Sequence, residues 1–364
     1  MIEHGEVVSR DIPFASSFPT SHEEHGPTRH VFVRLVADDI TGYGEGTSLL
    51  WFTGESSNTM ESVVREQLLP QVVGKSIKDA ITAFSDYVGR LPNNPGAKTA
   101  VEMSLLDLRG KQLGVPVANL LGPYRRTTIP CAWASGALPP SEVADNAEQA
   151  YKDGYRTFKI KADGDVDGDV ARIDAVTERF DSLNATDANI RFDANTGWET
   201  YEKAHTAISR MKHKQYIEYF EQPLPDSRLG EMEELRKKLG VPIFADESVH
   251  SVRDVINVTN GPSNVSGFCA KLAKTGSLVD LTTMGRVAAT NGCPVTLVSA
   301  FESSLGLAAD LHIAATLPIL SSATELGGGH LTQDPVVDGL SQTPEYTVPE
   351  SPGLGVDLDP GLFD

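Results

Sequence analysis

Short apolar segments recur through the central and C-terminal parts of the chain, and each is followed by a polar loop and a stretch with helical periodicity. Apolar runs of this length are typical of strands buried on both faces of a parallel sheet. Seven such runs can be identified: TIPCAWAS (128–135), RTFKIKA (156–162), NIRFDAN (189–195), YIEYFEQ (216–222), VPIFADE (241–247), SGFCAKL (266–272) and CPVTLVS (293–299).

The spacing of these runs matches a strand followed by a crossover helix. The polar residues near the ends of five successive runs are separated by 32, 28, 25 and 25 residues, which is enough for a βα unit. Helical patterns at 201–213 and 229–240 lie between them, and Gly240 is a predicted C-cap. Seven or eight units predict a TIM-like (β/α)-barrel over 126–330, with its eighth strand near 323–326. An open doubly wound sheet is the alternative, but it would carry a glycine-rich phosphate turn after its first strand.

Residues 1–125 follow a different pattern, which predicts a separate α+β domain. Residues 30–38 alternate like an antiparallel strand, and the glycine-rich stretch 42–46 predicts a turn. The C-terminal segment 331–364 is rich in Pro and Gly, and we expect it to lie on the surface and to return to the first domain. Three further stretches of the first domain have helical periodicity: 59–71, 77–89 and 98–113.

The amino-acid composition disfavours some classes of binding partner. Hydrophobic residues make up 40% of the chain and charged residues 22%, as in a soluble globular protein. Asp and Glu outnumber Lys and Arg by 50 to 31, for a net charge of −19, which disfavours nucleic acid or an anionic membrane as partner. The chain has no apolar run long enough to span a membrane, and its first residues do not resemble a signal peptide. We therefore expect a cytoplasmic protein.

Charged side chains lie at the ends of the predicted strands. A charge at the end of a buried strand is unusual and calls for an explanation. Asp193, Glu221 and Asp246 end three successive strands, and the carboxyl ends of barrel strands meet on one face. Three converging carboxylates repel one another unless a cation neutralises them, and hard oxygen ligands suit Mg²⁺ or Mn²⁺. Structural salt bridges are the alternative for each residue alone, but the regular spacing of the set favours a metal site.

Two lysines flank this carboxylate triad in the sequence. Lys161 and Lys271 end the second and sixth predicted strands, which lie on opposite sides of a barrel mouth. A lysine beside a divalent cation is a usable base, because the positive field favours its neutral form. A cation that binds a carboxylate also acidifies the α-proton. The predicted chemistry is therefore proton transfer next to a carboxylate.

The ordered motifs KIK (159–161), FDAN (192–195), EQP (221–223), DES (246–248) and AKLAK (270–274) resemble the enolase superfamily, in its muconate-lactonizing-enzyme subgroup. The resemblance covers nearly the whole chain and implies a modified TIM barrel with an N-terminal α+β capping domain. It implies a magnesium enzyme, with Asp193, Glu221 and Asp246 as metal ligands and with Lys161 and Lys271 as the acid/base pair.

Further roles follow from the same resemblance. Lys159 would help to hold the substrate carboxylate, and Asn195 and Glu247 would orient the ligands and Lys271. Glu302, at the end of the seventh strand, would line the pocket. By their position alone, we expect Trp133 and Phe301 to line the pocket too, with specificity carried by the loops 16–26 and 49–55.

The reaction is less sharply defined by the sequence. The segment TELGGGH (324–330) lacks the DxD motif typical of dipeptide epimerases and is closer to muconate cycloisomerases, which we favour. An o-succinylbenzoate synthase, which ESSLG (302–306) resembles, or an N-acylamino acid racemase is the runner-up. A non-catalytic metal-binding barrel is the alternative of another class, but it would need neither lysine. The expected partner is a small carboxylate substrate, and relatives of this kind are commonly homo-oligomers.

Overall fold

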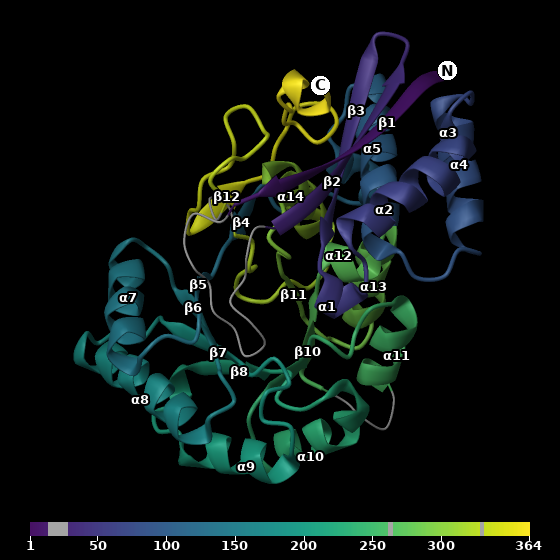
Figure 1. Ribbon diagram of the computed structural model, residues 1–364. Coiled ribbons are helices and arrows are strands. Elements are labelled where there is room, and N and C mark those ends of the chain that lie inside the picture. Colours follow the sequence, from purple (N-terminus) through teal and green to yellow (C-terminus); the bar gives the residue numbers. More distant parts are fainter. Residues whose placement is uncertain (14–27, 261–264, 328–330) are drawn as a thin grey trace.

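The computed structural model describes residues 1–13, 28–260, 265–327 and 331–364 (Figure 1). Its N-terminal part is a three-stranded antiparallel sheet in the order β1 (Ile2–Ile12), β2 (Thr28–Ala37) and β3 (Ile40–Ser48). The predicted strand at 30–38 is confirmed as β2. The helices of this cap are α1 (Leu50–Thr53), α2 (Ser57–Val63), α3 (Leu69–Val72), α4 (Ile77–Val88), α5 (Pro95–Leu113) and α6 (Val117–Leu121), with a π-helical turn at Val64–Leu68 between α2 and α3.

The glycine-rich stretch 42–46 was predicted to be a turn, but it forms the middle of β3. A Cβ on Gly44 would lie 1.9 Å from the carbonyl oxygen of Ala100, and one on Gly46 would lie 2.3 Å from that of Gly96. The alternate glycines therefore form a flat stripe on which α5 packs with its backbone close to the strand. Close approach of a helix, rather than a change of chain direction, explains these glycines.

The central part of the chain forms a parallel sheet that curls into a barrel with helices along its outer face (Figure 1). Its strands, in spatial order, are β5 (Trp133–Ser135), β6 (Thr157–Lys161), β7 (Asn189–Asp193), β8 (Ile217–Glu221), β9 (Ile243–Ala245), β10 (Gly267–Ala270) and β11 (Val295–Leu297). The helices are α7 (Pro140–Lys152), α8 (Val166–Ser182), α9 (Tyr201–Arg210), α10 (Leu229–Leu239), α11 (Val252–Asn260), α12 (Leu272–Thr275), α13 (Leu278–Ala289) and α14 (Ser304–Thr316).

The side chains of these strands alternate between the helices and the barrel interior. Phe158, Phe192 and Phe220 belong to the large apolar cluster between sheet and helices. A separate, small cluster of Tyr219, Phe244, Cys269 and Val298 accounts for the apolar part of the interior. The strand ends therefore carry their charged residues on the inward face, as the barrel prediction requires.

The eighth strand of the barrel is shorter than predicted. At the predicted place, only Thr324 and Glu325 make bridges, to Cys131 on one side and to Val298 on the other. Ala132 N–H donates to the Thr324 carbonyl at 2.7 Å, and Glu325 N–H donates to that of Leu297 at 2.8 Å. Two residues thus close the ring between the first and the last strand.

The C-terminal segment lies beside the cap in Figure 1. Its strand β12 (Glu345–Thr347) pairs antiparallel with β4 (Thr128–Pro130). Near its end, the Phe363 ring lies 4.7 Å from the Arg34 guanidinium of β2. The domain boundaries at 125 and 330 stay predictions. No helix in the part of the chain that the structure describes is long and apolar enough to cross a membrane.

Candidate active site

Strand register brings the predicted polar residues side by side. Lys161 of β6 is paired with Asp193 of β7, which is paired in turn with Glu221 of β8. Asp246 directly follows β9, the next strand in the sheet. Asp193, Glu221 and Asp246 are fully buried, so their charges depend on the groups beside them.

Two lysines of β6 neutralise the first of these carboxylates. Lys159 Nζ lies 2.9 Å from Asp193 Oδ2 and 2.8 Å from Glu221 Oε1, and Lys161 Nζ also donates to Asp193 Oδ2. Burial raises the pKa of Asp193, but Lys159 and Lys161 outweigh it and leave that pKa below its usual range. Asp193 is therefore ionised at neutral pH.

Asp246 is held in the same way from the opposite side. Lys271 Nζ contacts Asp246 Oδ2, and Lys274 Nζ contacts Oδ1 at 2.5 Å and the Asp246 carbonyl at 2.7 Å. Burial raises the pKa of Asp246, but the two lysines outweigh it and keep the pKa low. Burial lowers the pKa of Lys271, but Asp246 outweighs it and keeps the pKa above its usual value.

Of the three buried carboxylates, Glu221 has an oxygen that is available to bind a metal ion. Its Oε2 is buried without a hydrogen-bond partner among the described residues, and burial together with Asp193 raises its pKa well above the usual value. The Lys159 ammonium lies between the carboxylates, and no group of three or more His, Cys, Asp or Glu side chains is close enough to hold a metal within the described ranges. The donors are nevertheless carboxylate oxygens with one oxygen unused, which fits a hard divalent cation bound by Asp193, Glu221 and Asp246.

Asn195 and Glu247 lie beside this cluster, and their role in orienting the ligands stays a prediction. Lys161 Nζ donates to Asn195 Oδ1 at 2.9 Å, and Asn195 Nδ2 donates to Glu247 Oε1 at 3.3 Å. Burial, with the charges of Asp246 and Asp193, raises the pKa of Glu247 to about 7. The Glu247 hydrogen bond goes to Asn195, so its relation to Lys271 is through charge alone.

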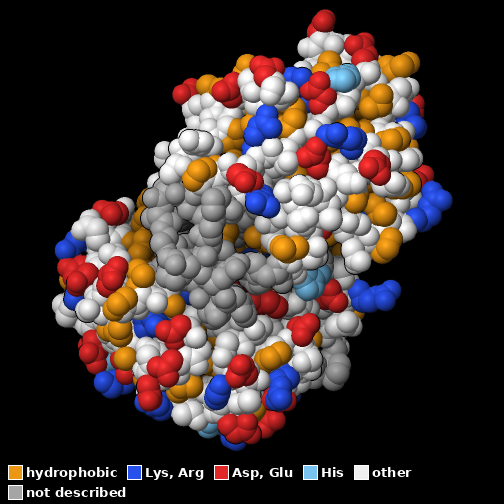
Figure 2. Space-filling view, in the orientation of Figure 1, with side chains coloured by type: hydrophobic (Ala, Val, Ile, Leu, Met, Phe, Trp, Pro, Cys, Tyr) orange, Lys and Arg blue, Asp and Glu red, His pale blue; other side chains and the backbone are white. Residues whose placement is uncertain are grey.

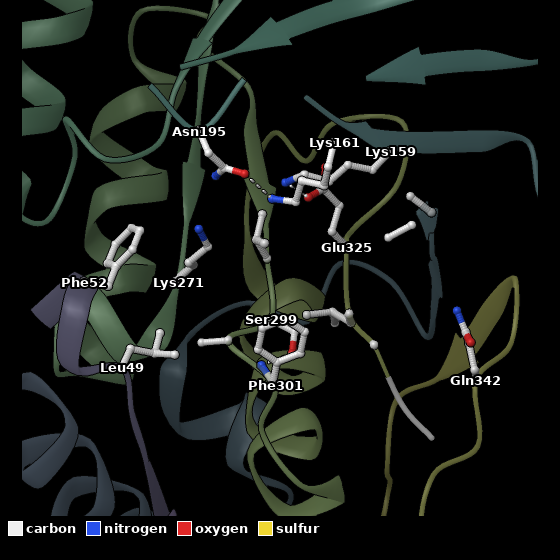
Figure 3. Close-up of a pocket in the computed structure, with 16 residues that line it drawn as sticks. Leu49, Phe52, Lys159, Lys161, Asn195, Lys271, Ser299, Phe301, Glu325 and Gln342 are labelled. Atoms are coloured by element: carbon white, nitrogen blue, oxygen red, sulfur yellow. Dashed lines mark hydrogen bonds and ion pairs between the residues drawn. The ribbon is translucent and has the colours of Figure 1, made fainter. Parts of the chain in front are cut away.

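A pocket opens above the cluster, and the lysines reach it from different sides (Figure 3). The side chains of Lys161 and Lys271 are 12% and 10% exposed, against 3% for Lys159, which lies deeper. The rest of the lining is mostly apolar and comes from the 49–55 loop, the first strand and the loops after β11 and at the ring closure: Leu49, Phe52, Ala132, Ala134, Val298, Ala300, Phe301 and Leu326.

Three of the predicted pocket residues have distinct outcomes. Phe301 lines the pocket as expected. Trp133 does not, because the alternation of β5 turns Ala132 and Ala134 inward and Trp133 outward, 6.2 Å from Phe158 between ring centroids. Glu302 turns back on its own loop instead of lining the pocket, and accepts hydrogen bonds from Ser299 Oγ at 2.6 Å and from Ala300 N–H at 2.7 Å.

The predicted specificity loops are described in part. The predicted loop 49–55 forms the short helix α1 in its middle; it contributes Leu49 and Phe52 to the pocket, and the Phe52 ring centroid lies 4.8 Å from Lys271 Nζ. Loop 16–26 lies outside the described residues. Figure 2 shows one face of the molecule, over whose described residues acidic and basic side chains are interspersed.

Sequence reasoning missed three charged residues of the interior. Lys274 holds Asp246, and Glu325 contacts Lys159 Nζ at 2.5 Å and Arg191 Nη1 at 3.1 Å. Arg191 was detectable as an arginine two residues before Asp193, on the same face of its strand. Glu325 was detectable as a carboxylate in the predicted eighth strand.

An α+β cap on a modified TIM barrel, with paired lysines and carboxylates on the strand ends, defines an isomerase of the enolase superfamily. Residues 3–122 match the family described as "Mandelate racemase / muconate lactonizing enzyme, N-terminal domain", and residues 142–362 match "Enolase C-terminal domain-like". The chain belongs to the mandelate racemase/muconate lactonizing enzyme family.

Individual relatives differ in their reactions. The chain is 31% identical to muconate cycloisomerase 1 of Rhodococcus opacus over 97% of its length and 95% of the relative. It is also 31% identical to L-Ala-D/L-Glu epimerase of Bacillus subtilis, over 95% of its length and 93% of the relative. The structure of N-succinyl Arg/Lys racemase from Bacillus cereus matches with a TM-score of 0.89 and 26% identity, over 99% of this chain and 96% of that one. Identity alone therefore does not select the reaction.

Proposed function

We propose that this protein transfers a proton at the carbon next to a substrate carboxylate, with Mg²⁺, or Mn²⁺ in its place, held by Asp193, Glu221 and Asp246. The observation that carries the proposal is that Lys161 and Lys271 line one pocket from β6 and from the end of β10. Three strands separate β6 from β10 in the sheet. A substrate carbon between the two lysines would face a proton donor or acceptor on each side.

Each charged residue then has a distinct task. The bound cation would neutralise the charge that develops on the substrate carboxylate during proton transfer. Lys159 would attract the same carboxylate from below. Lys161, oriented by Asn195 at 2.9 Å, and Lys271, covered by the Phe52 ring, would exchange the proton with the α-carbon. The apolar lining would limit access of water to the reacting carbon.

Within this chemistry we infer a muconate-type cycloisomerase. In that reaction one carboxylate oxygen of an unsaturated dicarboxylate adds to a double bond, and the carbon next to the other carboxylate takes a proton from a lysine, so that a lactone forms without loss of atoms. Glu325 is already bound by Lys159, Arg191 and the Tyr219 hydroxyl. Glu325 lines the pocket, but its charge is already balanced by these two cations, so it would attract the amine of a dipeptide only weakly, which supports the choice against a dipeptide epimerase.

Racemisation of an N-acylamino acid is the second candidate. The placement of Lys161 and Lys271 at opposite sides of the pocket favours it, because racemisation removes a proton from one face and returns it to the other. Dehydration to o-succinylbenzoate is a further alternative that needs the same base. A non-catalytic metal-binding barrel would require neither lysine.

Proton NMR in D₂O with Mg²⁺ tests these alternatives together. The panel contains cis,cis-muconate, N-succinylamino acids, the o-succinylbenzoate precursor and several dipeptides. Lactone formation from muconate supports the cycloisomerase, whereas deuterium that enters only at an α-carbon reassigns the enzyme as a racemase or epimerase. Turnover unaffected by Lys161→Ala and Lys271→Ala, with the exposed Lys152→Ala as control, would contradict the mechanism.

A further inference from the structure

The interior of this barrel contains buried ion pairs, whereas the interior of most TIM barrels is filled by apolar side chains. Barrel interiors are normally filled by layers of branched apolar side chains. Here Lys159 and Arg191 occupy the centre, and both are buried. They form a continuous chain of contacts with carboxylates, from Glu218 at one end to Asp193 and Glu221 at the other.

Arg191 fixes the segment that closes the barrel. Its Nη2 donates to the Ala323 carbonyl at 2.9 Å and to the hydroxyls of Ser321 and Ser322 at 3.3 and 3.2 Å. Its Nε donates to Glu218 Oε2 at 2.8 Å. Backbone hydrogen bonds of Thr324 and Glu325 to the neighbouring strands hold the main chain of this segment, and the guanidinium adds the side-chain contacts that fix where the Glu325 carboxylate lies.

Glu325 connects Arg191 to the catalytic cluster. Its Oε1 accepts from Arg191 Nη1 at 3.1 Å and from the Tyr219 hydroxyl at 3.0 Å, and its Oε2 accepts from Lys159 Nζ at 2.5 Å. Lys159 therefore has three carboxylate partners: Glu325, and the proposed metal ligands Asp193 and Glu221.

We propose that Arg191 is a positioning residue that, through Glu325, provides Lys159 with a counter-ion of its own and so leaves Asp193 and Glu221 available to a divalent cation. An ammonium without a partner in a buried site is unfavourable by several kcal/mol. With Glu325 in place, Lys159 keeps one carboxylate when the other two turn to the cation. Without it, Lys159 competes with the cation for those two ligands. This inference rests on the cation of the proposed function.

The proposal is tested by whether Arg191→Met strengthens or weakens Mg²⁺ binding. By charge alone, removal of a buried cation near the site strengthens Mg²⁺ binding. The positioning role predicts the opposite, because Glu325 loses its anchor and Lys159 then stays paired with Asp193 and Glu221 in competition with the cation. We expect calorimetry on the folded full-length variant to show Mg²⁺ binding at least about tenfold weaker than in the wild type, with Arg191→Lys intermediate.

Arg172 provides a matched control. It is also a buried arginine, with contacts to Asp169 at 2.6 Å and Asp163 at 2.7 Å, but these lie outside the interior chain. Arg172→Met is expected to lower thermal stability and leave Mg²⁺ affinity unchanged. Equal weakening in Arg172→Met, or unchanged or tighter binding in Arg191→Met, would overturn the proposal.

A milder variant covers the case in which Arg191→Met does not fold. Tyr219→Phe removes one hydrogen bond to Glu325 and keeps the ring stacked on Phe244, where the centroids are 3.8 Å apart. We expect Mg²⁺ binding to weaken by about twofold to fivefold, in line with the loss of one hydrogen bond, and unchanged affinity counts against the proposal. If the wild type itself binds no Mg²⁺, the cation of the proposed function fails as well, which separates the two failures.

Discussion

The barrel interior and the interface between cap and barrel both bury carboxyl groups, but they stabilise them in opposite ways. In the interior, Asp193, Asp246 and Glu325 each contact a lysine or an arginine. At the interface, both carboxyl oxygens of Asp310 on α14 and one oxygen of Glu302 lack a hydrogen-bond partner among the described residues. Burial, with the nearby charges, raises the pKa of both interface groups.

Burial alone therefore does not decide the charge of a carboxyl group in this protein. Glu45 lies at the same interface, yet its pKa is lowered: burial raises it, but His30 at 2.6 Å and Ser303, which donates from its backbone N–H at 2.8 Å, outweigh the effect. The pKa stays low where cationic or hydrogen-bonding partners outweigh burial, as at Asp193, Asp246 and Glu45. At Glu221, burial and the neighbouring Asp193 outweigh Lys159, and the pKa is raised. Asp310 lacks a hydrogen-bond partner among the described residues, and burial together with the charges of Glu302 and Glu45 raises its pKa well above the usual value.

The largest effect is expected where a paired carboxylate is removed. Asp193→Ala leaves Lys159 and Lys161 short of a counter-ion and removes a proposed metal ligand. Breaking a buried ion pair costs about 3–5 kcal/mol, so we expect a large drop in the free energy of unfolding. We also expect Mg²⁺ binding to disappear from calorimetry.

A control for that change is Asp163→Ala, which removes a half-exposed partner of Arg172 and is expected to retain Mg²⁺ binding. Unaltered Mg²⁺ affinity in Asp193→Ala would show that the interior carboxylates serve only as ion-pair partners of the lysines.

Asp310→Asn tests the neutral side of the comparison through pH. The pKa of Asp310 in the folded protein lies well above its usual value, so the folded state keeps a proton that the unfolded state loses. The stabilisation is therefore complete at acid pH below the unfolded pKa of about 3.9, and declines by up to about 1.4 kcal/mol per pH unit as pH rises toward the folded pKa. An asparagine cannot ionise and avoids this decline.

Urea unfolding of wild type and Asp310→Asn over a pH series measures this difference. We expect the stability of the variant relative to wild type to increase steadily from acid to neutral pH. A difference that does not change with pH would mean that Asp310 is ionised in the native protein. The groups whose charges act on Asp310 are Glu302 and Glu45, and the same series on Glu302→Gln checks the contribution of Glu302.

Glu302 itself is expected to have a smaller effect that is local to the pocket. Its Oε2 fixes the loop that carries Phe301, whose φ is +64°. Glu302→Gln keeps an acceptor at this place and should change stability by less than about 1 kcal/mol, whereas Glu302→Ala removes it and should cost about 1–3 kcal/mol. Because Phe301 lines the pocket, we expect Glu302→Ala to raise KM more than it lowers kcat. Equal effects of both variants would contradict the anchoring role.

The sequence was most informative where chemistry and periodicity coincide. The strand ends at Lys161, Asp193 and Glu221 could be placed because regularly spaced buried strands rarely end in charged residues unless those charges are paired or bind a ligand. Gly44 was misread because a glycine-rich stretch predicts a turn until the helix packed against it is known. Glu302 was misplaced because loop geometry, rather than strand alternation, decides where its side chain points.

Other features depend on contacts distant in sequence. Arg191 and Glu325 are far apart in the chain and meet only when the ring closes, so neither could be assigned a partner from spacing. The eighth strand was predicted at 323–326, but the sequence did not show that only Thr324 and Glu325 would form bridges there, or that the Arg191 side chain would add contacts to the same segment.

The smallest effect is expected for an ion pair outside both regions. Arg156 Nε lies 2.6 Å from Asp187 Oδ2, but both side chains are about half exposed. Water already solvates these charges, so Asp187→Ala should change the free energy of unfolding by less than about 1 kcal/mol, and less still in high salt. Chemical denaturation at low and high salt measures this. A loss as large as that of Asp193→Ala would mean that an ion pair contributes the same wherever it lies, and that burial is not what distinguishes the charges of the barrel interior.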